Sequence, residues 1–306
     1  TNPEFENTVR EGGGMKEKKG TCIKNEIIFL APAIICFSCI VLIPFIYSFA
    51  TSLTKWNGIS KNIQWNGIAN YKKILSDKAF LNSFIYTLKN MFVVTVIANA
   101  LGLLFALILT CKIRGSQIFR TTLILPNILS GIVLGFVWKF IFSDVLPQIG
   151  ETLNCKFLEL SWLARPTSAF WSVAIVSIWQ MTGYVMLIYI AGIIAIPGDL
   201  IESAYVDGAG NMQVIKKIIL PHLKPSFVVC IFWTISKTLL SFDLQFSLTQ
   251  GGPFKSTETL AINIYQEAFE KNNYGVGNAK AILFFVTVVV FSLLQNYLTR
   301  RNASES

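Results

Sequence analysis

The stretch AFWSVAIVSIWQMTGYVMLIYIAGIIAIP, from Ala169 to Pro197, is 29 residues long and contains no charged side chain. A helix needs roughly 20 predominantly apolar residues to cross the hydrocarbon core of a bilayer. Buried helices of water-soluble proteins seldom keep an uncharged run for this length. The stretch therefore predicts a transmembrane helix.

Five further runs have the same apolar character, and together with the first they decide the fold class. They are Ile27–Ala50, Met91–Thr110, Thr121–Trp138, Ala281–Leu298 and, apolar apart from Lys237 and Asp243, Pro225–Phe246. Only 14% of the residues are charged, whereas a soluble domain carries about 25%. We therefore predict an all-α integral membrane protein with six transmembrane helices, over about 26–50, 84–110, 120–142, 169–193, 225–246 and 279–299.

The net charge of +9 is explained by the positive-inside rule, and we expect no nucleic-acid partner. Basic residues gather in the segments that six spans would place on one side of the membrane, namely Lys16, Lys18, Lys19, Lys24, Lys112, Arg114, Arg120, Lys216, Lys217, Lys224, Arg300 and Arg301. Lysines in 51–79 weaken this bias, but the other two loops of the opposite side contain more acids than bases. We predict a bacterial plasma membrane protein with both termini in the cytoplasm.

The first 14 residues are polar and lead into Met15, and we interpret them as an expression scar. Residues 15–306 are then expected to form a single transmembrane domain with a long cytoplasmic link at about 198–224.

The residues do not indicate an enzyme. Six cysteines are scattered, and Cys36 and Cys39 form a CxxC pair on a predicted membrane helix, where cysteine behaves as a small apolar residue. The single histidine, His222, lies in a loop beside a proline, and no P-loop sequence is present. We expect no catalytic residue, no metal site and no cofactor, so any ATP and Mg²⁺ must be bound by another subunit.

The link between the fourth and fifth runs has its own pattern. It predicts a short helix, a break at Gly208 and Gly210 where positive φ is possible, and a second helix that ends at Pro221. Apolar residues line one side of each helix. Such a hairpin is suited to insert into a groove on another protein, although these residues alone favour an ordinary interfacial loop.

The same segment resembles the EAA loop of ABC importer permeases, which reads Glu-Ala-Ala, three residues, Gly, nine residues, Ile-x-Leu-Pro. Glu202, Gly208, Ile218, Leu220 and Pro221 match in position, and Ser203 replaces the first alanine. The resemblance implies the type I importer architecture, with the loop seated as a coupling helix in an ATPase subunit. The coupling residues it implies are Glu202, Ser203, Ala204, Asp207, Gly208, Ala209 and Pro221.

Other segments resemble carbohydrate-uptake permeases of the di- and oligosaccharide group, in particular the larger-subunit type of maltose permeases. They include Asn70-Tyr71, Leu125-Pro126 and Phe242-Asp243 followed by Thr249-Gln250-Gly251-Gly252-Pro253. This resemblance implies a heterodimer with a second permease subunit, two ATPase subunits, an extracellular solute-binding protein and a sugar substrate. Lipid surrounds the spans.

A candidate solute site follows from polar residues inside the spans. Thr234, Lys237, Thr238 and Ser241 are spaced i, i+3, i+4 and i+7, so they share one helix face, and Tyr184 offers an aromatic ring for a sugar. The alternative is that each hydroxyl bonds to a neighbouring helix or to its own backbone. The resemblance to maltose-type permeases adds Asn127, Gln180 and Met181; Lys237 departs from that type, which has an aromatic residue there.

Three other functions remain open, one of which is a scaffold or sensor subunit that does not transport. An importer permease for a non-sugar or acidic solute, such as a glycerol-phosphate-like compound or a uronate, would share the EAA loop. A secondary transporter would need no ATPase dock and commonly has internal repeats, of which we find none here.

Overall fold

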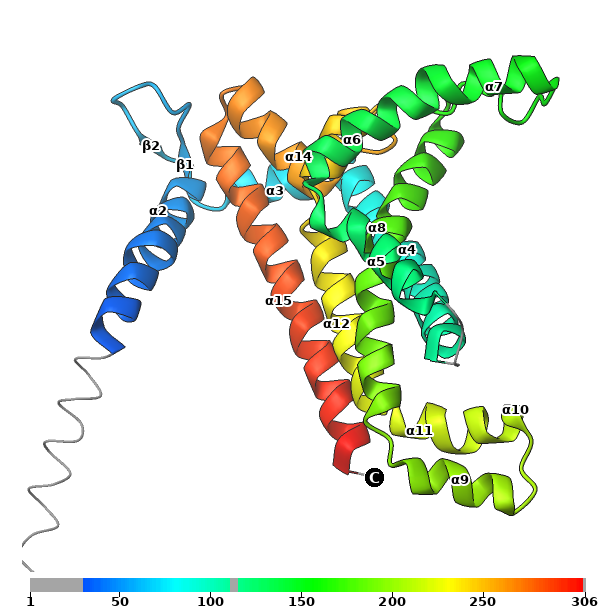
Figure 1. The fold of residues 1–306 in the computed structure, drawn as a ribbon. Coiled ribbons are helices and arrows are strands. Elements are labelled where there is room, and N and C mark those ends of the chain that lie inside the picture. Colours follow the sequence, from blue (N-terminus) through cyan, green and yellow to red (C-terminus); the bar gives the residue numbers. More distant parts are fainter. Residues whose placement is uncertain (1–29, 111–114, 305–306) are drawn as a thin grey trace, which may run out of the picture.

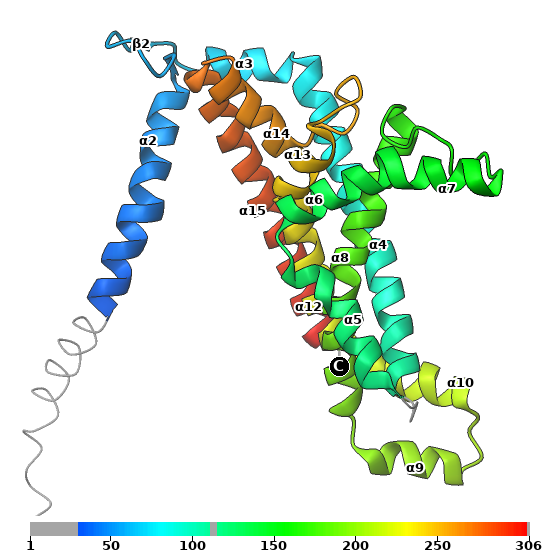
Figure 2. The same ribbon diagram turned by 45° about the horizontal axis from the view of Figure 1, so that its top comes forward.

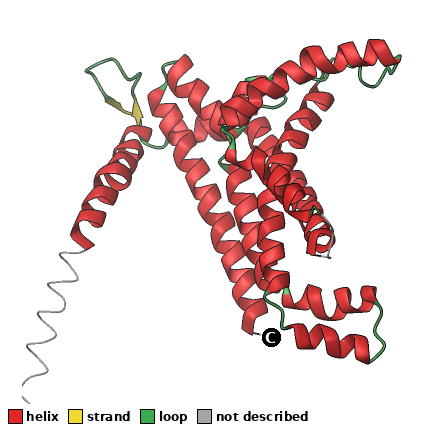
Figure 3. Cartoon of the chain, viewed as in Figure 1, coloured by secondary structure: helices red, strands yellow, loops and turns green. Residues whose placement is uncertain are grey.

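The computed structural model describes residues 30–110 and 115–304, and side chains of the last helix up to Gln295 and at Tyr297. The expected scar at 1–14, and Lys16, Lys18, Lys19, Lys24, Lys112 and Arg114, lie outside the described residues. Within the described part the chain is almost entirely helical, with one pair of two-residue strands (Figure 3).

Five helices of the described chain are long and apolar enough to cross a membrane, and a sixth crossing results if a bent pair of helices counts as one span. The five are Leu30–Ser52, which includes η2 (Ser38–Leu42) and α2 (Ile43–Ser52), α4 (Lys78–Thr110), Gly131–Leu153, α8 (Pro166–Ile194) and Tyr274–Gln295 of α15 (Tyr274–Ser304). The bent pair joins Asn211–His222 to α12 (Lys224–Leu239) at an angle of 66°.

The core of the bundle is formed by α4, α8 and α12, with α5 (Ser116–Ile128) packed on α8 (Figure 1). Val94 and Ala98 of α4 meet Ala174 and Ile178 of α8 in a buried apolar cluster. Gly183 of α8 lies so close to the backbone of α5 that a side chain at this position would collide with it. Small residues allow close packing where lipid supplies no hydrophobic driving force between helices.

The helix expected over 120–142 is broken in the structure. α5 ends at Ile128, Leu129 and Ser130 have extended backbone, and α6 (Gly131–Phe140) begins in a new direction. Pro126 removes a hydrogen-bond donor from the last turn of α5, which weakens that turn. The turn η3 (Ile141–Val145) and α7 (Leu146–Leu153) continue α6 into an arm that leaves the bundle (Figure 2).

The helix expected over 225–246 is also shorter than the sequence indicated. α12 ends at Leu239, and a separate helix α13 (Asp243–Thr249) turns to pack on α6. The contact depends on Gly131 and Gly135, because a side chain at Gly135 would collide with the hydroxyl of Ser247. These two glycines form a GxxxG pattern, a signature of close helix packing in membranes that the sequence analysis did not use.

The loops at the end of the bundle opposite the C-terminal end of α15 contain short elements that tie the helices together (Figure 1). They are β1 (Thr54–Lys55), β2 (Gln64–Trp65), α3 (Ala69–Leu75), α14 (Leu260–Tyr265) and η5 (Gln266–Glu270). The buried Asn70 donates from its amide to the carbonyls of Ser52 at 2.7 Å and Thr54 at 2.9 Å, which fixes α3 beneath the strand.

Candidate functional site

The coupling segment forms a helical hairpin outside the bundle. Its first arm is α9 (Gly198–Val206), and its second arm consists of α10 (Asn211–Val214), η4 (Ile215–Ile219) and α11 (Leu220–His222). In both ribbon views the hairpin projects from the end of the bundle at which the C-terminal end of α15 lies (Figures 1 and 2).

The turn of the hairpin is built around Gly208. Its φ is +80°, a left-handed conformation that favours glycine, whereas Gly210 has φ −76°, so the expectation of positive φ is correct for Gly208 and wrong for Gly210. The amide of Ala209 donates to the carbonyl of Ala204 at 2.9 Å, and the amide of Gly208 donates to Tyr205 at 3.1 Å. This pair of hydrogen bonds is the Schellman motif, which satisfies the last carbonyls of α9.

The predicted coupling residues share one exposed region. Glu202, Ser203, Asp207, Gly208 and Pro221 are exposed, and Ala204 and Ala209 are half-buried. Large apolar side chains are exposed beside them, with Val206 at 87% and Met212 at 62%. Exposed apolar residues gathered on a projecting hairpin are typical of a protein-docking surface.

The predicted solute residues lie on α5, on α8, on α12 and just after α12, and α8 packs against both of the other helices. The amide of Asn127 donates to the carbonyl of Gln180 at 3.3 Å, which joins α5 to α8. The hydroxyl of Thr238 lies 3.6 Å from the sulfur of Met181, which joins α12 to α8. In this structure Asn127 thus lies beside Gln180, and Thr238 lies beside Met181.

The predicted four-residue stripe is not one helix face in the structure: α12 ends at Leu239, so Ser241 lies beyond it, and the other three residues divide into a buried pair and an exposed lysine. Thr234 and Thr238 are buried, and their hydroxyls donate to the carbonyls of Cys230 at 2.9 Å and Thr234 at 2.7 Å. Thr234 also accepts from the amide of Asn99 at 3.1 Å, and Asn99 accepts from the hydroxyl of Tyr189 at 2.9 Å. In this conformation these two hydroxyls therefore bond to their own helix backbone, and Thr234 also bonds to a neighbouring helix, as the alternative to solute contact predicted.

The other members of the stripe lie nearer the surface. Lys237 is exposed, and among the described residues no carboxylate lies within ion-pair distance of it. Ser241 is half-buried and bonds to Gln245. Tyr184 stacks on Trp233, with ring centroids 4.1 Å apart and an angle of 27° between the planes. Sequence reasoning missed Trp233, although it lies four residues before Lys237 and hence on the same helix face.

A buried polar cluster at the opposite end of the bundle from the hairpin was also missed. Lys280 of α15 is 1% exposed, and its ammonium lies 3.0 Å from Glu267, 2.8 Å from Asn263 and 3.3 Å from Asp77. Glu258, also 1% exposed, accepts from the hydroxyl of Ser83 at 3.0 Å. The signal was available, because Lys280 is a charged residue inside the predicted span 279–299.

Glu267 is ionised in this cluster. Burial alone would raise the pKa of its carboxyl, but hydrogen bonds from Lys271, Lys280 and Asn273 together lower the pKa to about 2. The hydrogen bond to Glu267 raises the pKa of Lys271. The cluster thus joins the segment of Glu258–Glu267 to α4 and α15 through charged and polar side chains.

Comparison with known proteins identifies the family. A family model described as "Binding-protein-dependent transport system inner membrane component" matches residues 98–304. The chain is 40% identical over 291 residues to a probable starch degradation products transport system permease protein of Thermoanaerobacterium thermosulfurigenes, with 94% of this chain and 99% of that protein covered. It is 34% identical over 250 residues to a multiple sugar-binding transport system permease protein of Streptococcus mutans, with 82% and 86% covered.

The fold has a counterpart among solved structures. A crystal structure of a bacterial ABC transporter involved in the import of the polysaccharide alginate contains a chain that matches with a TM-score of 0.80 at 21% identity, covering 93% of this chain and 99% of that chain. The resemblance drawn from the Glu202–Pro221 segment is thereby confirmed at the level of family and fold. The chain belongs to the binding-protein-dependent transport system inner membrane components, and it is an all-helical permease subunit of the ABC importer class.

Proposed function

We propose that this chain is one of two permease subunits of an ATP-driven importer for an oligosaccharide. An extracellular binding protein delivers the solute, and two ATPase subunits bind ATP and Mg²⁺ and drive alternating access. Two facts support this proposal: the family is defined by its dependence on a binding protein, and both relatives above are named for starch products or multiple sugars.

The observation that carries the proposal is the exposed hairpin α9–α11. Its turn is fixed by the Schellman motif at Gly208, and its surface combines the carboxylate of Glu202 with exposed apolar residues. A rigid helical hairpin of this kind is suited to a groove on a partner. We propose that the partner is the ATPase subunit and that the hairpin transmits its closure to the bundle.

The orientation follows from the same proposal. If the hairpin meets a cytoplasmic ATPase, the C-terminal end of α15 is cytoplasmic, because it lies at the same end of the bundle (Figure 1). A cysteine introduced at Ser203 in a background without other cysteines should be labelled by an impermeant thiol reagent only in opened cells. Labelling in intact cells would contradict this orientation.

A second permease subunit is supported by the helix Leu30–Ser52. Its most apolar window has no buried residue in the single chain, and it leans away from the bundle in both views (Figures 1 and 2). It touches α15 near one end, where the rings of Phe45 and Phe285 lie 4.9 Å apart. A helix that leaves this much surface free is suited to pack against another membrane subunit.

We propose that the solute passes the junction of α5, α8 and α12. Asn127, Gln180 and Met181 line the α5–α8 side, while the stacked rings of Tyr184 and Trp233 supply an aromatic surface suited to sugar rings. Lys237 on α12 and Ser241 just after this helix supply donors. Thr234 and Thr238 could contact solute only after α12 moves, since their hydroxyls are now buried.

An acidic solute is the second candidate, and Lys237 is the observation that favours it. The ammonium of an exposed lysine without a carboxylate partner among the described residues is free to bind a carboxylate or phosphate. Competition in an uptake assay between neutral oligosaccharides and sugars with a uronate or phosphate group distinguishes the two.

The test of the proposed function is ATPase stimulation in the reconstituted complex. The complex of both permeases and two ATPase subunits should hydrolyse ATP faster when its binding protein is loaded with an oligosaccharide. Equal hydrolysis with loaded and empty binding protein, in a complex that is fully assembled, would overturn it.

A further inference from the structure

An exposed lysine interrupts the apolar outer face of α4. Ile85, Phe92 and Val96 are 62%, 67% and 51% exposed, and Lys89 shares their face at helical spacing. Charged residues on an apolar face of a membrane helix are costly and require a partner or water. Among the described residues no carboxylate lies within ion-pair distance of Lys89; its ammonium lies 4.5 Å from the centre of the Phe170 ring.

Lys89 lines a cavity of about 720 Å³, which lies between the Lys78 end of α4, the start of α8 and the loop after α13. Lys255 of that loop also lines it; this side chain is 55% exposed and its ammonium is 3.6 Å from Glu258. Tyr86 is 7% exposed, lines the same cavity, and its buried hydroxyl has no hydrogen-bond partner in the structure. Two ammonium groups and a free hydroxyl make a site for an oxyanion.

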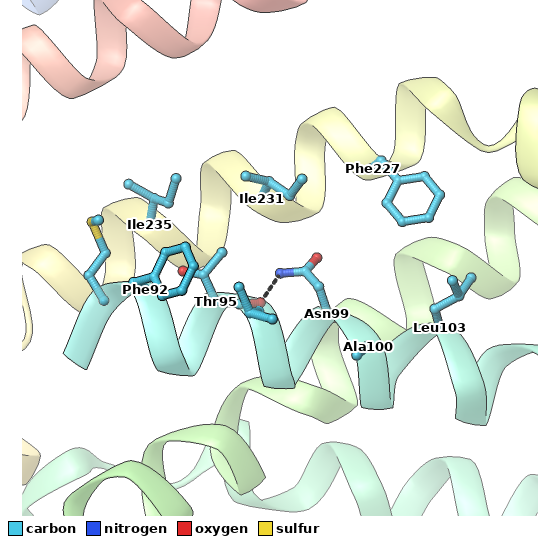
Figure 4. A pocket seen from close by; sticks show the side chains of 10 residues that line it. Phe92, Thr95, Asn99, Ala100, Leu103, Phe227, Ile231 and Ile235 are labelled. Carbon is cyan, nitrogen blue, oxygen red and sulfur yellow. Dashed lines mark hydrogen bonds between the residues drawn. The ribbon is translucent and has the colours of Figure 1, made fainter. Parts of the chain in front are cut away.

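A second, apolar groove of about 450 Å³ lies further along α4, between α4 and α12 (Figure 4). Phe92, Val96 and Leu103 of α4 line it together with Phe227 and Ile231 of α12. The α4 residues that line the groove run from Met91 to Leu103, a rise of about 18 Å at about 1.5 Å per residue, which exceeds half the roughly 30 Å thickness of a bilayer core. The groove is therefore long enough for the acyl chain of one leaflet.

We propose that this flank of α4 is a binding site for an anionic phospholipid in the leaflet at the Lys78 end. Its phosphate binds Lys89, with Tyr86 and Lys255 as further donors, and its acyl chain lies in the groove between α4 and α12. The charge of the headgroup complements the two lysines, and the apolar groove distinguishes a lipid from a soluble phosphate. The site is separate from the solute junction and does not depend on which solute is carried.

The test is lipid retention by the purified full complex, measured by native mass spectrometry after exchange into nanodiscs of phosphatidylcholine with or without phosphatidylglycerol. The wild type should retain phosphatidylglycerol and gain thermal stability from it. Lys89→Gln should lower retention at least about tenfold, as expected for the loss of a charged donor. Lys89→Arg should restore it, and Tyr86→Phe should lower it less.

The matched control is Lys78→Gln, which removes the same charge from an exposed position of the same helix that does not line the cavity. It should retain lipid as the wild type does. Equal retention by Lys89→Gln and Lys78→Gln would overturn the proposal. So would an equal stabilisation by soluble glycerophosphate, which would identify a small-phosphate site, or cross-linking of a cysteine at position 89 to the second permease.

Discussion

The backbone amide of Ala209 donates to the carbonyl of Ala204 at 2.9 Å, across a turn in which Gly208 has φ +80°. An added side chain at Gly208 would meet no neighbouring atom, so the turn requires glycine for its backbone conformation alone. A neighbouring glycine, Gly210, has the same free space but an ordinary extended backbone. Since neither position is crowded, substitutions at the two glycines differ only in the backbone conformation that the new residue must adopt.

Gly208→Ala should weaken the coupling of ATP hydrolysis to transport. A non-glycine residue in this conformation costs of order 1–3 kcal/mol, and the hydrogen bonds that terminate α9 would be disturbed. Binding-protein-stimulated ATPase activity should fall several-fold or more, and Gly208→Val should lower it further because β-branched residues resist positive φ. Gly210→Ala is the control and should keep wild-type activity. Equal activity in the two alanine variants would contradict the role of the turn.

Lys280→Met should destabilise the protein strongly. It leaves Glu267 and Asp77 without a buried cation, and the loss of one partner from a buried pair costs about 3–5 kcal/mol. Lys271→Met is the matched control: it removes a cation 2.9 Å from the same carboxylate, but that lysine is 49% exposed and should cost about 0–1 kcal/mol. Thermal unfolding in detergent measures the loss of stability in both variants. Similar losses would show that burial of the lysine does not determine its contribution to stability.

The stability provided by Glu267 should depend on pH in one direction. Its pKa is lowered from 4.5 to about 2 in the folded chain, so its contribution is complete above pH 4.5 and is lost as pH falls from there toward 2. The difference in unfolding temperature between the wild type and Glu267→Gln should be constant above that range and shrink below it. A difference that grows on acidification would contradict the assignment.

Lys237 and Thr234 should respond differently to substitution. Thr234→Val removes a buried hydrogen bond between helices, and such bonds average about 0.6 kcal/mol in membrane proteins, so stability should fall slightly while solute preference is unchanged. Lys237→Ala should leave stability unchanged and lower uptake if the lysine contacts solute. Unchanged uptake in Lys237→Ala would remove this residue from the solute path.

The sequence was sufficient for the parts of the fold that depend on local pattern. Long uncharged runs predicted α4 and α8, and the Glu202–Pro221 segment predicted a helix, a turn at Gly208 and a second helix. These features depend on residues close in the chain, such as a positive φ or an apolar run. The sequence alone therefore predicts these features, without knowledge of the neighbouring helices.

The remaining features depend on contacts between distant residues. The breaks after Ile128 and Leu239 let α13 pack against Gly131 and Gly135, a contact between segments more than 100 residues apart in the chain. The burial of Thr234 likewise depends on Asn99 of α4, 135 residues away. Helical spacing groups Thr234 with Lys237, but it cannot say which side of α12 faces the bundle.

The proposed function requires that ATP hydrolysis drives oligosaccharide uptake through this permease. Its most direct test is uptake of labelled linear glucose oligosaccharides into liposomes that contain the full complex, with loaded binding protein outside and ATP inside. Accumulation should require both ATP and binding protein, and it should fall several-fold or more in Gly208→Val because of the strain expected at this turn. Uptake that persists without ATP, or that is unchanged in an assembled Gly208→Val complex, would contradict it.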